Sequence, residues 1–187
     1  MSFRHLERDE NVYKWQGSEI ALIEWDELTH FSEKMFFYML SRNRSTSNVK
    51  PYIRASCNPD ADSWVAQFIS WWIDQDTGYA IPERSGKIRY MARVNEEIVW
   101  GDSPEDVVKI ANDADYDVEI TEDDVKSVSF VASNIYDNEV LLKSNKGYLS
   151  NLKALTIVER ERLLYGNWKI KAAKGLYFPP QRIAGAA

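Results

Sequence analysis

The stretch Ile20-Ala21-Leu22-Ile23-Glu24-Trp25-Asp26-Glu27 places a short apolar run directly before an acidic pair. Such a run without alternation is typical of a buried strand in a parallel sheet, and we predict this strand over Ile20–Ile23. Carboxylates at a strand's end suit phosphoryl transfer, in which Asp26 holds a magnesium ion and Glu27 orients the attacking water. Alternatively, the pair is simply the acidic start of the next helix, favoured by about 0.3–1 kcal/mol.

The chain contains no Gly-x-x-x-x-Gly-Lys-Ser/Thr loop, the segment that cradles nucleotide phosphates in many hydrolases. Its only Gly-Lys pair is Gly86-Lys87, and Ile88 follows where Ser or Thr is needed. The position of the first glycine is occupied by Ile81. The acidic pair therefore represents one half of a catalytic site.

Composition limits the class of protein. A chain of 187 residues that is 44% hydrophobic and 28% charged is typical of one globular domain, with or without a small appendage. No apolar run approaches ~20 residues, so no membrane span is expected. The charged N-terminus has no signal-peptide core, which predicts that the protein stays inside the cell. A single cysteine, Cys57, excludes an internal disulfide and a multi-cysteine metal site.

The net charge of −6 is unevenly distributed. Twelve acidic residues and one basic residue lie between Glu96 and Asp124, whereas nine basic and two acidic residues lie between Lys143 and Arg182. The basic tail permits contact with a polyanion such as DNA, although solvated surface charge is the commoner explanation.

Hydrophobic spacing and turn residues predict alternating helices and strands. Ser32 is expected to cap a helix that ends near Arg42, and a strand follows over Tyr52–Ser56. The later expected elements are a helix with apolar residues from Trp64 to Trp72 that stops at Thr77-Gly78, a hairpin of Lys87–Val94 and Glu97–Trp100, a helix starting at Ser103, a strand over Val125–Ala132, and helices over Tyr148–Leu155 and from Thr156 to Gly166. This alternation over residues 20–132 favours an α/β layered sheet, followed by a small helical subdomain.

A second polar segment, Ser56-Cys57-Asn58-Pro59, follows the second predicted strand. Because ligands bind at the carboxyl ends of parallel strands, we expect this segment beside Asp26 and Glu27. The Asn58 amide can sense a terminal phosphate or its attacking water there. The alternative is an ordinary Asn-Pro turn.

Two further groups of side chains are candidates for ligand contact. Arg42, Arg44 and Arg54 can contact phosphate or act as an arginine finger, although surface salt bridges are the commoner role of such arginines. Three tryptophans can stack on nucleic-acid bases but more often pack in a core: Trp64, Trp71 and Trp72.

Taken in order, these segments resemble the large subunit of tailed-bacteriophage terminases, the motors that pump DNA into a procapsid. The resemblance runs from about Tyr13 to about Phe178. The segments that carry it are Glu24–Phe31, which is similar to a Walker B segment, Ser41–Arg44, Ser56–Pro59, Asp137-Asn138, Tyr148 with Leu152 and Leu155, Arg162–Trp168, and Gly175–Phe178.

The resemblance implies a partial P-loop NTPase sheet of the ASCE type that lacks its phosphate-loop strand. In it, Asp26 would bind magnesium through water, and Glu27 would be the general base for ATP hydrolysis. Arg42 and Arg44 would be candidates for the arginine finger or a phosphate contact. Three residues would form the motif that couples hydrolysis to movement: Cys57, Asn58 and Pro59.

The resemblance also implies a domain plan. Residues 1–132 would be the C-terminal part of the ATPase core, with an acidic insertion at about 80–124. Residues 133–178 would form a helical lid or linker, and residues 179–187 a flexible tail. No nuclease domain or nuclease activity is expected. Without a phosphate loop, the chain alone is expected to bind ATP poorly and to be inactive.

The implied partners are double-stranded DNA, the portal and the small terminase subunit, in the cytoplasm of the bacterial host. A missing central strand would leave exposed sheet edges, so we also expect an N-terminal half that supplies the phosphate loop, or self-association. Two functions remain open: one half of a split packaging ATPase, or a non-catalytic prophage remnant that binds DNA or motor subunits.

Overall fold

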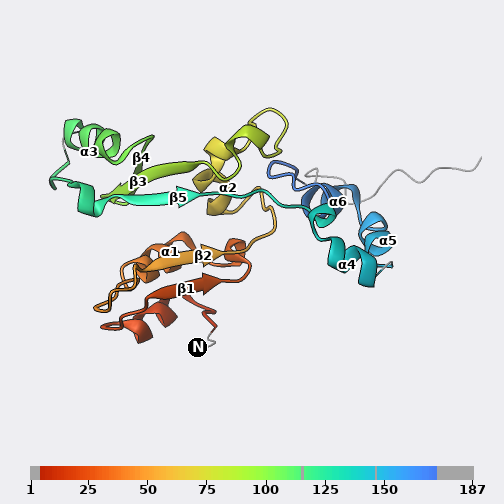
Figure 1. The fold of residues 1–187 in the computed structure, drawn as a ribbon, viewed down its shortest axis with the longest axis horizontal. Helices are drawn as coiled ribbons and strands as arrows, with labels where there is room; N and C mark the ends of the chain where they lie inside the picture. Colours follow the sequence, from red (N-terminus) through yellow and green to blue (C-terminus); the bar gives the residue numbers. More distant parts are fainter. Residues whose placement is uncertain (1–4, 115, 146, 172–187) are drawn as a thin grey trace, which may run out of the picture.

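The described strands form two separate sheets, a parallel pair and an antiparallel sheet of three strands (Figure 1). The computed structural model describes residues 5–114, 116–145 and 147–171. The expected flexible tail at 179–187 and the segment Gly175–Phe178 lie outside these residues. No helix within the described ranges is long and apolar enough to cross a membrane.

The parallel pair belongs to a strand–helix–strand unit. A 3-10 helix, η1 (Asp9–Trp15), precedes β1 (Leu22–Trp25). A 3-10 turn, η2 (Leu28–His30), leads into α1 (Glu33–Leu40), and the chain then returns to β2 (Tyr52–Ala55). The predicted second strand, Tyr52–Ser56, is thus confirmed to within one residue.

Helix α1 begins at its expected cap. The Ser32 Oγ accepts a hydrogen bond from the Met35 N–H at 3.1 Å and donates one to Asp9 Oδ1 at 2.6 Å. Such a cap satisfies an N–H group that has no partner within the helix. The buried residues of α1 are Met35, Phe36, Phe37 and Met39.

The first strand lies two residues later than predicted, and only one of its faces is covered. β1 spans Leu22–Trp25 rather than Ile20–Ile23. Trp25 is 6% exposed and packs edge-on against Phe31, whereas Leu22 on the opposite face is 40% exposed. Since successive strand side chains point to opposite faces, an apolar run alone does not establish that both faces are buried.

The second helix is also shorter than predicted. α2 (Trp64–Phe68) ends well before Gly78, and a 3-10 turn, η3 (Ser70–Trp72), follows it. Ile73 then forms an antiparallel bridge with Ala80, so the chain reverses direction between them. Residues 73–78, which were predicted to continue towards the end of the helix, instead form the reversal closed by this bridge.

The three-stranded sheet has the order β4–β3–β5. It contains β3 (Ile88–Val94), β4 (Glu97–Gly101) and β5 (Lys126–Ser129), all antiparallel. α3 (Pro104–Asp113) follows β4, and its cap Ser103 accepts a hydrogen bond from the Asp106 N–H, as predicted. Short 3-10 turns flank the sheet: η4 (Pro82–Arg84) and η5 (Glu122–Asp124).

The described strands over residues 20–132 do not form the one layered sheet expected there, because β3, β4 and β5 form a sheet separate from β1 and β2. β3 and β4 are joined by a tight turn in which Asn95 and Glu96 both have positive φ angles, 49° and 68°. Such a turn matches the twist of two neighbouring antiparallel strands, so these strands pair with each other and not with β1 and β2. The alternation of helices and strands was predicted correctly, and the chain is of mixed α/β composition.

The antiparallel sheet separates two hydrophobic cores. Met91 on one face joins the larger core, which is formed mainly by β1, α1 and α2. Ala92 and Val94 face the smaller core, which they share with Val107 and Ala111 of α3. The period-two alternation along β3 produces this division.

The C-terminal helices gather at the end of the molecule opposite α3 (Figure 1). They are α4 (Glu139–Ser144), α5 (Tyr148–Lys153) and α6 (Ile157–Leu163), preceded by the turn η6 (Ile135–Asp137). The predicted capping box at Thr156 is confirmed.

Candidate catalytic site

The carboxyl ends of β1 and β2 lie side by side, as the parallel arrangement requires. The Ser56 N–H donates to the Trp25 carbonyl at 2.9 Å, and the Leu28 N–H donates to the Ser56 carbonyl at 2.8 Å. These two bonds continue the ladder past the last paired residues. The segments that follow the two strands are therefore fixed against each other.

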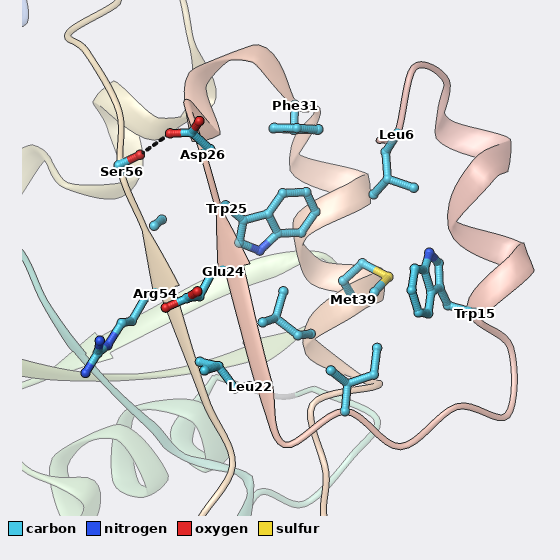
Figure 2. A pocket seen from close by; sticks show the side chains of 13 residues that line it. Leu6, Trp15, Leu22, Glu24, Trp25, Asp26, Phe31, Met39, Arg54 and Ser56 are labelled. Carbon is cyan, nitrogen blue, oxygen red and sulfur yellow. Dashed lines mark hydrogen bonds between the residues drawn. The ribbon is translucent and has the colours of Figure 1, made fainter. Parts of the chain in front are cut away.

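Asp26 is held by a hydroxyl from the neighbouring strand end. The Ser56 Oγ–H donates to Asp26 Oδ1 at 2.8 Å (Figure 2). The same Ser56 Oγ accepts a weaker bond from the Glu27 N–H at 3.4 Å. Asp26 is solvent-exposed, so a ligand can reach its carboxylate from solution.

Asn58 donates two hydrogen bonds to the Glu27 carboxylate. The Asn58 backbone N–H donates to Glu27 Oε2 at 3.1 Å, and the side-chain Nδ2 donates to Oε1 at 2.7 Å. Hydrogen bonds to a charged acceptor are about twice as strong as neutral ones, and two together fix the plane of the carboxylate. The structure thus brings Asp26, Glu27 and Asn58 together, as the sequence predicts.

The Glu27 backbone adopts the left-handed conformation, with φ 56° and ψ 59°. This costs a residue with a Cβ roughly 1–2 kcal/mol, and such outliers concentrate at functional sites. The turn directs the two adjacent carboxylates to different partners, Asp26 to Ser56 and Glu27 to Asn58. Two carboxylates with distinct surroundings suit two distinct tasks.

Cys57 and Pro59 complete the loop. Burial, followed by the negative charge of Glu27, raises the pKa of the Cys57 thiol to about 11. Pro59 is buried, and its carbonyl accepts a hydrogen bond from the Arg162 Nε of α6 at 2.8 Å. Neither side chain offers a reactive group at neutral pH, so both support the geometry of the loop.

The structure does not bring Arg42 and Arg44 to the acidic pair. The Arg42 carbonyl accepts from the Ile20 N–H at 3.1 Å, and Arg44 donates to the Gly17 carbonyl at 3.3 Å. Both contacts lie before the start of β1, because α1 runs back along the strand. By contrast, Arg54 lines the same cavity as Asp26 and Ser56.

The tryptophans are packed within the fold. Trp72 is fully buried, and Trp64 donates its indole N–H to a backbone carbonyl at 2.8 Å. The guanidinium groups of Arg84 and Arg89 lie 4.7 and 4.9 Å from the centroid of the Trp71 ring. The packing interpretation therefore accounts for all three.

A cavity of about 870 Å³ extends along β1 and reaches Asp26 (Figure 2). Beside it, the buried Trp25 Nε1 has no hydrogen-bond partner among the described residues. The residues that line the cavity include Trp15 of η1, Leu22 of β1, Met39 of α1 and Arg54 of β2. Both strand faces contribute, so the cavity follows the strand rather than the acidic pair alone.

A metal ion at this site would depend on one carboxylate. The described residues include no cluster of three or more His, Cys, Asp or Glu side chains that could hold a metal. Magnesium usually retains several waters and uses one or two carboxylates together with substrate phosphates. Asp26, with the Ser56 hydroxyl beside it, fits that mode of binding and does not fit an all-protein metal cage.

Two residues of the site have no role that the sequence predicts. Ser56 is recognisable from the sequence only as part of a polar segment, although its position directly after β2 marks it as a neighbour of Asp26. Arg162 lies 103 residues from Pro59, and no local sequence signal predicts their contact.

Comparison with known proteins identifies the family. No curated protein and no solved structure matches the chain. The family model for the terminase large subunit, T4-like-virus type, N-terminal region, matches residues 1–184. This match covers nearly the whole chain and includes every residue of the site. The chain therefore belongs to the family of phage terminase large subunits of the T4-like-virus type.

Proposed function

We propose that the chain is part of a DNA-packaging ATPase in which Asp26 and Glu27 form the Walker B pair. The observation that carries this proposal is the double hydrogen bond from Asn58 to Glu27, which joins the acidic pair to the predicted coupling motif. A structural acidic helix start needs no such contact with the next strand.

Each carboxylate has a distinct role in this proposal. Asp26 holds magnesium through water, and the ion, when bound, would neutralise charge on the phosphates of ATP. Glu27 accepts a proton from the attacking water, and general-base catalysis of this kind contributes typically 10²–10⁴-fold. Asn58 aligns the Glu27 carboxylate through its two hydrogen bonds. These bonds weaken when Glu27 takes up the proton, since a protonated oxygen is a weaker acceptor.

The phosphate loop must come from polypeptide outside the 187 residues of this chain. β1 and β2 each pair with one described strand only, so the described pair has two unpaired edges. The cavity along β1 and the unsatisfied Trp25 indole support an additional segment packing there. The proposed layered NTPase sheet would be completed by that polypeptide, which is one form of the expected partner.

The domain plan is part of the same proposal. The hairpin β3–β4 and α3 have a small core of their own, which supports an acidic insertion at about 80–124 within a core that ends near residue 132. Helices α4 to α6 support a helical segment at 133–178. DNA, the portal and the small subunit are proposed as partners because the chain belongs to this family.

The test is ATP hydrolysis by the chain combined with a terminase polypeptide that carries the phosphate loop. Glu27→Gln is expected to lower turnover by about 10²–10⁴-fold while ATP binding is retained. Glu83→Gln is the matched control, since Glu83 is exposed on η4 and does not line the cavity along β1. A folded, loop-containing complex without turnover would overturn the proposal.

The same assay separates the non-catalytic alternative. The basic tail would then bind DNA, although Lys169 and Lys171 already bond within the chain, to the Gln75 carbonyl and to Asp62. Lys174 lies outside the described residues. Salt-sensitive DNA binding that falls when these lysines are neutralised, together with no turnover, would favour the remnant.

A further inference from the structure

Helix α6 contacts the segment Ser56–Pro59, called here the catalytic loop after its proposed function, through the Arg162 side chain. The Arg162 Nε donates to the Pro59 carbonyl at 2.8 Å in a partly buried setting. A buried carbonyl requires a hydrogen-bond partner, and no described backbone N–H donates to this one. Arg162 therefore satisfies a group that the loop itself leaves unpaired.

The loop transmits this contact to Glu27 because it is stiff. The proline ring fixes φ of Pro59, and the residue before a proline is confined to extended conformations. Few soft torsions therefore separate the Pro59 carbonyl from the two Asn58 donors that hold the Glu27 carboxylate. Any displacement of the carbonyl other than a rotation about ψ of Pro59 therefore turns Asn58.

The last turn of α6, which carries Arg162, and the segment that follows it are also tied to a distant turn. Glu161 accepts a hydrogen bond from the Tyr79 hydroxyl, and the Trp168 N–H donates to the Gly78 carbonyl at 2.8 Å. Asn167 is buried and donates to the Thr77 carbonyl at 3.2 Å. The helix thus bridges the turn at residues 77–79 and the catalytic loop.

We propose that Arg162 is a positioning residue for Glu27: it holds the Pro59 carbonyl, keeps Asn58 on the carboxylate, and links the placement of α6 to the water-activating group. The role of Glu27 in this proposal rests on the proposed function. The link from Arg162 through Pro59 and Asn58 to the Glu27 carboxylate does not. A shift of α6 relative to the strands therefore loosens the Glu27 carboxylate.

Cys57 provides a direct probe of the link, because it is the only cysteine in the sequence and lies inside the loop. The experiment measures its alkylation rate by iodoacetamide at pH 8.5, without nucleotide. Arg162→Met is expected to raise the rate by about tenfold, the change that follows from losing a hydrogen bond of a charged donor. Arg160→Met is the matched control on the same helix, since the Arg160 side chain donates to the Lys153 carbonyl and not to the loop.

A folded Arg162→Met variant that reacts at the wild-type rate would overturn the link. Arg162→Lys, which keeps a donor within reach, is expected to react at a rate between those of the wild type and Arg162→Met, and it serves if Arg162→Met does not fold. In the completed ATPase, Arg162→Met should lower kcat while KM for ATP stays unchanged. A faster Cys57 reaction with unchanged kcat would support the link and contradict the role proposed for Glu27.

Discussion

The parallel pair and the antiparallel sheet of this protein place their loops differently. β1 and β2 end on the same side, so the residues after them meet, and Asp26, Ser56, Glu27 and Asn58 form one hydrogen-bonded group. In the antiparallel sheet, successive strands end on opposite sides, and the larger share of its side chains serves packing against α3 and the main core. The comparison shows that strand direction, more than composition, decides where polar side chains collect.

The largest expected effect on stability is that of replacing Trp72, which packs between the main core and the antiparallel sheet. Trp72 is fully buried, lies 5.9 Å from the Trp100 ring of β4 and donates to the Lys87 carbonyl at 3.1 Å. Trp72→Ala should lower the free energy of unfolding by about 3–5 kcal/mol. Urea denaturation measures this change. Val140→Ala, at a side chain 78% exposed, should stay within about 0.5 kcal/mol, and equal losses would contradict the packing described.

The core under α3 is expected to be separable from the catalytic loop. Val107 is fully buried there, and Val107→Ala should lower the free energy of unfolding by about 1.5–3 kcal/mol. At urea concentrations below the unfolding transition, Cys57 in Val107→Ala should be alkylated at the wild-type rate. Ile110→Ala, on the same helix at a side chain 48% exposed, is the control. A faster Cys57 reaction in Val107→Ala would show that the two regions are coupled.

The turn that anchors α6 is expected to tolerate no side chain. Gly78 has φ +82°, and an added Cβ would lie 2.4 Å from Asn167 Oδ1. Gly78→Ala should cost the roughly 1–2 kcal/mol of the left-handed conformation and, in addition, displace Asn167. Gly17→Ala isolates the first cost, since Gly17 has φ +81° and no described atom within 4 Å of an added Cβ. Equal melting-temperature shifts in the two variants would refute the steric contribution.

The smallest expected effect is a pH dependence from Cys57. Its pKa is raised from the ordinary 9.0 to about 11 in the folded protein, by burial and by Glu27. Above pH 9 the unfolded chain therefore loses its thiol proton first, so stability should fall as pH rises from 9 to 11. Urea midpoints across this range measure the slope, and Cys57→Ala should make it shallower. An identical slope in both proteins would contradict the assigned pKa.

The sequence predicted the features that depend on local chemistry. Ser32, Ser103 and Thr156 cap helices because a side-chain oxygen can reach N–H groups within the first turn. The meeting of Asp26 and Glu27 with Asn58 followed from one rule about parallel strands. These signals act over a few residues or through a single pairing.

The features that were mispredicted or missed depend on contacts between distant segments. The division into two sheets follows from the pairing of β3 with β4 and β5, which no periodicity within β1 can reveal. The displacement of Arg42 and Arg44 from the site follows from the direction of α1. The bond from Arg162 to Pro59 spans 103 residues and has no sequence pattern.

The central claim is that Glu27 and Asn58 act as one catalytic unit. A double-mutant cycle on kcat in the loop-completed ATPase tests it most directly, with Glu27→Gln, Asn58→Ala and the double variant. If Asn58 acts by aligning the Glu27 carboxylate, Asn58→Ala should slow the wild-type enzyme but cause no further loss once Glu27→Gln is present. Two independent losses that multiply in the double variant would contradict the claim.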